Sequence, residues 1–174
     1  QSMTSRDNFV DFEKKVQSCL SPGEIDDPAK APLPPYYPDT PTARRTVARY
    51  YDCISTLDVW VKKKLAELEA DGLAQDTIVF FFSDHGAGLP RAKQWIFEAG
   101  LQVPLLIHFP EKWRRLAPAA PGSVVEQLVS LVDLAPSVLS LVGERIPAHM
   151  QGVPFLGTKA GAPRPYVLGI RDRM

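Results

Sequence analysis

Apolar side chains recur at steps of three and four residues in the stretch between Pro41 and Gly72. This spacing is typical of an amphipathic helix that buries one face. Thr40 can act as the N-cap, Pro41 suits the first helical position and Gly72 suits the stop. We therefore predict one long helix here. Its apolar face consists of Val47, Tyr50, Ile54, Leu57, Val61, Leu65 and Leu68.

Two short apolar runs follow, at 77–82 and 103–109. Both are nearly continuous and rich in β-branched, aromatic or aliphatic residues, which is typical of parallel strands covered on both faces. A further helix is predicted around 133–141, and the stretch 165–171 has the composition of another strand. The order helix, strand, strand, helix predicts an α/β fold with a layered sheet.

The segment before the long helix has a different composition. Between Leu20 and Thr40 the chain is dense in proline, which favours an extended, partly polyproline II conformation over helix or sheet. The prolines are Pro22, Pro28, Pro32, Pro34, Pro35 and Pro38. We therefore expect an extended segment over 1–40 and an α/β part over 41–174.

Charge and composition exclude several classes of protein. The 174 residues are 45% apolar, which is enough for the core of one ordinary domain. Twenty basic and twenty acidic residues balance, so no overall field attracts nucleic acid or an anionic membrane. The apolar runs are far shorter than the roughly 20 residues that span a bilayer. We expect neither nucleic acid nor membrane as a partner, and the oligomeric state stays open.

Asp84 and His85 follow the first predicted strand. In α/β sheets ligands collect beyond the carboxyl ends of the strands, where loops converge. A carboxylate and an imidazole are both metal ligands, and Gly86 and Gly88 allow the backbone to approach a bound group closely. In the structural alternative, Asp84 caps the next segment and His85 is a hydrogen-bonded loop residue. Position alone does not decide between these interpretations.

The wider string resembles the sulfatase branch of the alkaline phosphatase superfamily. Ser83-Asp-His-Gly is similar to the family's Ser-Asp-(Asn or His)-Gly at a strand end. The string that starts at Lys93 matches Lys-x-x-x-(Tyr or Phe)-Glu-x-Gly-x-Arg-x-Pro, except that Gln102 replaces the arginine. Further similar motifs are Pro38-Asp-Thr-Pro, Ser130-Leu-Val-Asp-Leu-Ala-Pro-Ser and Gln151-Gly-Val-Pro-Phe-Leu. Together these motifs follow the family's order from about Pro34 to Met174.

The resemblance implies an alkaline-phosphatase-like fold with a mixed, mostly parallel sheet flanked by helices. It implies that Asp84 and His85 bind one divalent cation, calcium in most sulfatases, with magnesium as the alternative. It also implies that Lys93 is a catalytic and substrate-binding residue that holds the sulfate oxygens. The implied substrate is a sulfated small molecule or glycan, cleaved at a sulfate ester or a sulfamate. Sulfatases are periplasmic, secreted or lysosomal, and no targeting segment is visible in this sequence.

The family's nucleophile is a formylglycine made from cysteine, or a serine, within Cys/Ser-x-Pro-Ser-Arg. Neither Cys19 nor Cys53 is followed by this pattern. We therefore expect an internal or C-terminal fragment, a partial sulfatase catalytic domain over 1–174 that carries half of the metal site. Such a fragment alone would not turn over substrate, because the covalent intermediate forms on the absent nucleophile.

Several other polar residues in these motifs are expected to be structural. Glu98 is expected to fix its loop through hydrogen bonds, and Asp133 to cap the helix that starts near Pro136. His108 and His149 are expected to be packing or surface residues.

Two alternative functions remain open. A two-zinc phosphodiesterase or phosphatase of the same superfamily also has Asp-His-Gly at a strand end, but it needs additional Asp and His ligands. The sequence has only three histidines and no His cluster near Asp84, which favours one metal. The other alternative is a non-catalytic binding module that keeps the fold, since fold alone does not establish function.

Overall fold

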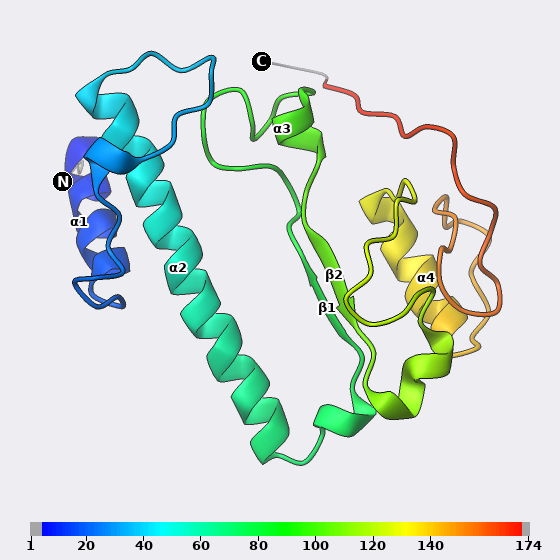
Figure 1. Cartoon of the computed structure of the whole chain (residues 1–174). Helices are drawn as coiled ribbons and strands as arrows, with labels where there is room; N and C mark the ends of the chain where they lie inside the picture. Colours follow the sequence, from blue (N-terminus) through cyan, green and yellow to red (C-terminus); the bar gives the residue numbers. More distant parts are fainter. Residues whose placement is uncertain (1–4, 172–174) are drawn as a thin grey trace. The chain divides into compact units, whose positions relative to one another are not determined.

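The computed structural model of this chain describes residues 5–171. The chain divides between Gly72 and Leu73 into two compact units. The first unit is helical, and the second contains a sheet and shorter helices (Figure 1). Within 5–171, no helix has both the length and the apolar character that crossing a bilayer requires.

The first unit contains two helices and a 3-10 turn. They are α1 (Ser5–Gln17), η1 (Pro28–Lys30) and α2 (Pro41–Ala70). The Thr40 hydroxyl accepts a hydrogen bond from the Ala43 amide at 3.2 Å, as an N-cap does. After α2, Gly72 has a left-handed φ of 71°, as is common where a helix stops. The long helix and both of its end signals are therefore confirmed.

The helix α1 lies within the segment 1–40, for which the sequence predicts an extended conformation. The structure differs from this expectation over 5–17. The first proline of the chain is Pro22, so no proline interrupts the helical hydrogen bonds of α1. Lys14 and Lys15 lie in its last turn, where cations interact favourably with the helix dipole. From Leu20 to Thr40, the only helical turn described is η1.

The apolar core of this unit is small. It consists of Ala31, Val47 and Ala48, with Leu33 and Tyr37 packed against it. Much of the remaining predicted apolar face of α2 stays exposed within this unit, including Ile54, Leu57 and Leu65. The helical spacing thus predicts the helix correctly, but only the N-terminal part of its apolar face is buried.

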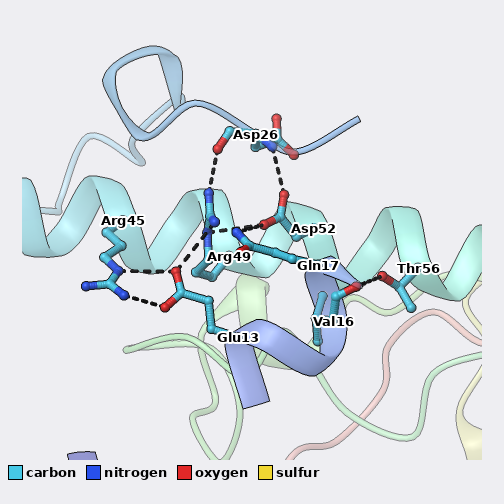
Figure 2. Close-up of polar contacts among 8 residues, drawn as sticks. All are labelled: Glu13, Val16, Gln17, Asp26, Arg45, Arg49, Asp52 and Thr56. Atoms are coloured by element: carbon cyan, nitrogen blue, oxygen red, sulfur yellow. Dashed lines mark hydrogen bonds and ion pairs between the residues drawn. The ribbon is translucent and has the colours of Figure 1, made fainter. Parts of the chain in front are cut away.

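A buried carboxylate joins α1, α2 and the loop between them. Asp52 on α2 is 0% exposed. It accepts hydrogen bonds from the Asp26 amide at 2.8 Å and the Gln17 side chain at 3.3 Å (Figure 2). The Arg49 guanidinium lies 3.2 Å from the same carboxylate and donates to the Asp26 carbonyl at 2.5 Å. Because a buried charge is costly unless it is paired and hydrogen-bonded, these contacts fix the helices to the loop.

The second unit contains the strands β1 (Val79–Phe82) and β2 (Leu105–His108), which lie side by side in Figure 1. They pair antiparallel, with Val79 opposite His108 and Phe82 opposite Leu105. Both predicted strands therefore exist. The mostly parallel sheet is not confirmed, because the described residues form only this antiparallel pair. The reason is that the loop 83–104 reverses the chain and returns it beside β1.

Short elements complete the second unit. They are η2 (Ala74–Asp76), α3 (Glu98–Leu101), η3 (Glu111–Leu116), η4 (Leu131–Asp133) and α4 (Leu134–Leu141). The predicted helix around 133–141 is thus confirmed as α4. The stretch 165–171 forms no strand, although its composition suits one.

Polar side chains of η4 and α4 bind the segment that follows them. The Asp133 carboxylate accepts hydrogen bonds from the amides of Ser130 at 2.9 Å and Val153 at 2.7 Å, and it pairs with Arg164. The Ser137 hydroxyl accepts a hydrogen bond from the Phe155 amide at 2.9 Å. Asp133 therefore caps the turn η4 and anchors a distant loop, while its side chain makes no capping bond to α4 itself.

Candidate metal and anion site

The loop between β1 and β2 carries the predicted metal ligands. Since β1 ends at Phe82, Asp84 and His85 lie just beyond the end of the strand. The Asp84 side chain is 81% exposed and the His85 side chain is 40% exposed. His85 Nε2 lies 3.4 Å from Asp84 Oδ1. The structure therefore brings the two predicted ligands together at an accessible place.

The backbone orients the His85 ring. Nδ1 lies 2.8 Å from the carbonyl oxygen of Gly86, which can only accept a hydrogen bond, so Nδ1 carries the proton of the neutral ring. Nε2 then keeps its lone pair on the side that faces Asp84. The Ser83 hydroxyl donates to the His85 carbonyl at 2.7 Å and holds this turn. The second ring nitrogen is thereby presented to a cation in the way that histidine ligands usually are.

Two glycines allow the loop to fold onto itself. The Gly86 amide donates to the Gly100 carbonyl at 3.3 Å, and a Cβ on Gly86 would overlap the Ala99 and Gly100 backbone. A Cβ on Gly100 would overlap the carbonyl oxygens of Ala92 and Trp95. Only glycine fits such close backbone approach. Direct backbone contact therefore holds the end of the loop against both its start and its middle.

Lys93 lies in the middle of this loop, between two residues with a left-handed backbone. Arg91 has a φ of 63° and Gln94 a φ of 69°, values that are uncommon for residues other than glycine. The Lys93 amide donates to the Ala87 carbonyl at 2.8 Å, and the Lys93 side chain is exposed. Strained backbone of this kind is concentrated at functional sites, where the surrounding structure maintains it.

The pair of donors fits a hard divalent cation. Calcium binds oxygen at about 2.3–2.6 Å, so two of its ligands at right angles lie about 3.3–3.7 Å apart. The 3.4 Å between His85 Nε2 and Asp84 Oδ1 falls in this range. In the part of the chain that the structure describes, no group of three or more His, Cys, Asp or Glu side chains could hold a metal. The described residues thus offer two neighbouring candidate ligands, and a complete coordination sphere would need others.

The remaining candidate residues lie apart from this pair. Glu98 begins α3, and its carboxylate makes no hydrogen bond or ion pair with another residue in 5–171, so the predicted loop-fixing contacts are not found. His108 is exposed on β2. His149 lines a shallow depression beside α4, together with Pro136 and Met150. Neither histidine belongs to a described metal-ligand group.

The sequence prediction missed an aromatic pair in the same loop. The rings of Trp95 and Phe97 stack with 12° between their planes and 5.7 Å between their centroids. The guanidinium of Arg91 lies 4.7 Å from the Phe97 centroid, and that of Arg171 lies 4.1 Å from the Trp95 centroid. The available signal in the sequence is the alternation from 91 to 97, where every second residue is a cation or an aromatic.

Known proteins are similar to this chain in sequence. A sequence model of the Sulfatase family matches residues 14–144. The chain is 39% identical to the ulvan-active sulfatase of Formosa agariphila over 91% of this chain and 26% of that protein. It is 34% identical to the N-sulphoglucosamine sulphohydrolase of Homo sapiens over 71% of this chain and 24% of that protein. This chain therefore belongs to the sulfatase family of the alkaline phosphatase superfamily.

A solved structure is similar in fold. The phosphonate monoester hydrolase SpPMH from Silicibacter pomeroyi aligns with a TM-score of 0.57 and 25% identity, over 90% of this chain and 31% of that chain. The present chain thus spans about a quarter of the length of these sulfatases and under a third of SpPMH. The α/β character of the fold agrees with this likeness.

Proposed function

We propose that this chain contributes a metal-ligand pair and an anion-binding lysine to a sulfuric ester hydrolase. The ligands in this proposal are Asp84 and His85, and the lysine is Lys93. The observation that carries the proposal is the 3.4 Å approach of His85 Nε2 to Asp84 Oδ1, at the end of a strand and in a loop closed by glycines. Family membership supports the reaction type.

Each residue has a distinct part in this mechanism. Asp84 Oδ1 and His85 Nε2 hold a divalent cation, which we propose to be calcium, with magnesium as the alternative. The Gly86 carbonyl keeps the proton of His85 on Nδ1, so Nε2 stays a ligand. When bound, the cation polarises the oxygens of the substrate sulfate. The Lys93 ammonium group donates to a sulfate oxygen and stabilises negative charge on the leaving oxygen in the transition state.

The proposed substrate is a sulfated saccharide. Two relatives are named for ulvan and for N-sulphoglucosamine, which are both saccharide substrates. The sulfate is then bonded either to a sugar oxygen, as an ester, or to a sugar nitrogen, as a sulfamate. The nucleophile that this chemistry requires is proposed to come from a part of the protein outside these 174 residues.

The test is an activity and metal assay on the complete protein that carries this chain. We expect hydrolysis of a sulfated saccharide and of 4-nitrophenyl sulfate, its loss after chelation of divalent cations, and its return with calcium or magnesium. Metal analysis should find one tightly bound divalent cation per active site. Two zinc ions per chain, or no hydrolysis of any sulfate ester or sulfamate, would refute the proposal.

A second candidate function is hydrolysis of phosphonate or phosphate esters. The likeness to SpPMH, which is named a phosphonate monoester hydrolase, favours it. Tetrahedral sulfate and phosphonate groups carry oxygens of similar geometry, so the same lysine and cation would hold either. The ratio of kcat/KM for a sulfate ester and a phosphonate monoester with the same leaving group decides between the two functions. A ratio above one favours the sulfatase.

A further inference from the structure

Ser83 joins the sheet to the turn that carries the candidate ligands. Its amide donates to the Pro104 carbonyl at 3.3 Å, one step beyond the last residue pair of β1 and β2, so its backbone continues the antiparallel ladder. Its hydroxyl donates to the His85 carbonyl at 2.7 Å, and this hydrogen bond spans Asp84. The short path from Ser83 to His85 is therefore fixed at both ends, by the strands at one end and by the hydroxyl at the other.

The backbone that follows the ligand pair is fixed as well. Gly86 is buried, and its amide donates to the Gly100 carbonyl at 3.3 Å. The Gly86 carbonyl accepts a hydrogen bond from His85 Nδ1 at 2.8 Å. Ser83 and Gly86 thus hold the pair from either side, and only Ser83 does so with a side chain. A change of Ser83 to a smaller residue can therefore loosen the turn without the backbone overlap that a side chain on Gly86 would cause.

The distance that this turn sets distinguishes cations of different size. Asp84 Oδ1 and His85 Nε2 lie 3.4 Å apart. Two ligands at right angles lie about 3.3–3.7 Å apart on calcium, but about 2.8–3.0 Å apart on magnesium, whose ligands lie at about 2.0–2.1 Å. To bind magnesium in this way, the two atoms must approach one another by about 0.4–0.6 Å. A turn that is held on both sides resists this movement, whereas a loose turn permits it.

We propose that Ser83 is a positioning residue that makes the site selective for calcium over magnesium, through the hydrogen bond from its hydroxyl to the His85 carbonyl. The hydroxyl acts on the ligands and is not itself one of them. It maintains the spacing of Asp84 Oδ1 and His85 Nε2, as groups outside the ligand set commonly do in metal sites. This inference rests on the proposed function, because it concerns the same cation. It adds the choice of cation, which the donor types alone leave open.

The test measures cation affinity, without substrate, in the complete protein that carries this chain. Calcium and magnesium are titrated calorimetrically into the metal-free parent and into Ser83→Ala. We expect the variant to raise the Kd for calcium about tenfold, the lower end of the range for losing a group that orients a ligand. The Kd for magnesium should rise no more than about threefold, because the loosened turn can close around the smaller ion. The preference for calcium, measured as the ratio of the magnesium Kd to the calcium Kd, should therefore fall at least about threefold.

Matched variants control this measurement. Ser83→Thr keeps the hydroxyl, so its calcium preference should stay within about twofold of the parent's. Ser18→Ala removes the same kind of bond elsewhere, because the Ser18 hydroxyl donates to the Lys15 carbonyl at 2.8 Å in the first unit. Both of its Kd values should stay within about twofold of the parent's. Urea unfolding of the metal-free proteins checks that each variant is folded. If Ser83→Ala does not fold, Ser83→Cys, which has a weaker donor of similar size, should show the same fall in preference.

The calcium preference is the measurement that identifies a positioning role. A general loss of structure raises both Kd values alike and leaves their ratio unchanged, so an unchanged ratio in Ser83→Ala overturns the inference even if sulfate esters are hydrolysed. A fall in Ser83→Thr as large as in Ser83→Ala also overturns it, because the hydroxyl is then not responsible. So does a parent that prefers magnesium.

The outcomes also separate this inference from the proposed function. A parent that binds neither cation refutes both. A fall in calcium preference that is confined to the variants without the Ser83 hydroxyl, in a protein that hydrolyses no sulfate ester or sulfamate, supports the inference and refutes the proposed function. Hydrolysis that depends on the cation, together with the same preference in every variant, leaves the proposed function standing and refutes the role of Ser83.

Discussion

Two aspartates of the second unit have opposite surroundings. The Asp133 side chain is 2% exposed and takes two backbone amides and the Arg164 guanidinium as partners. The Asp84 side chain is 81% exposed, and the only partner described for it is Nε2 of His85. A carboxylate whose lone pairs are occupied by donors stabilises the fold, whereas one with open lone pairs beside an imidazole can bind a cation. Burial and partners, rather than residue type, therefore distinguish the structural aspartate from the candidate ligand.

The largest effect is expected from Asp84→Ala. This change should abolish tight cation binding and lower kcat in the complete protein by at least about a thousandfold, because one of the cation ligands is lost. Metal content and turnover measure the effect. Without metal, its free energy of unfolding should change by no more than about 0.5 kcal/mol, since the residue is exposed. An unchanged metal content would refute the assignment of Asp84 as a ligand.

The Asp133→Asn variant is expected to lose stability instead of cation binding. An amide NH₂ would face backbone donors, and Arg164 would lose its counter-charge, so the free energy of unfolding should fall by about 2–4 kcal/mol. Chemical denaturation measures this change. The control is Glu111→Gln, which removes an exposed ion pair with Arg114 and should cost no more than about 0.5 kcal/mol. Equal stability of the two variants would contradict the structural role of Asp133.

A smaller effect is expected from Lys93→Ala. It should lower kcat by about a hundredfold, because a cation that stabilises the transition state is removed. Stability and metal content should be unchanged, since the side chain is exposed. Steady-state kinetics measure the change, with Lys62→Ala on the exposed face of α2 as the control. Normal turnover in Lys93→Ala would make Lys93 an ordinary surface residue.

The smallest effect on stability is expected at Asp39, an exposed carboxylate that pairs with Arg44. Arg44 makes hydrogen bonds to both oxygens of Asp39, at 2.6 and 2.8 Å, and thereby lowers the pKa of that carboxyl below its usual value of 3.8. A lowered folded-state pKa means that the stabilisation is complete above the unfolded-state pKa and is lost as pH falls through the folded-state pKa. Asp39→Asn should therefore slightly reduce the free energy of unfolding at neutral pH. In this variant that free energy should also fall less steeply as the pH drops below about 4. Denaturation curves at several pH values measure this, and an unchanged pH profile would contradict it.

Local signals predicted much of the fold. The Thr40 cap, the spacing of apolar residues and Gly72 predict α2, and the apolar runs predict both strands, because these features depend on neighbouring residues. The direction of strand pairing depends on the path of the loop 83–104, which no local pattern encodes. The helix α1 was missed for a different reason: the expectation drawn from the prolines of 20–40 was extended to the whole of 1–40, although α1 precedes the first proline. The ion pairs of its Glu13 with Arg45 and Arg49, far along the chain, could not be predicted from local sequence (Figure 2).

The candidate site, like the fold, could be predicted from the sequence only in part. Motif and position predicted Asp84 and His85, and the structure brings them together, although their role as ligands stays a prediction. The alternation from 91 to 97 was a signal for the ring stack of Trp95 and Phe97, whereas the approach of Arg171 to Trp95 could not be predicted, because Arg171 is distant in sequence. Side-chain contacts of this kind depend on tertiary packing, which the order of residues alone does not specify.

The contact between Gly86 and Gly100 has a consequence for mutational scans. Neither glycine has a functional group, yet a side chain on either would overlap backbone atoms across the loop. Substitutions at both positions should therefore inactivate the protein as thoroughly as changes to groups that take part in the reaction. A scan that ranks positions by tolerance alone would place these two residues among the catalytic ones. Measuring the cation affinity of Gly86→Ala would then show whether the loss of activity comes from a distorted loop or from the loss of a catalytic group.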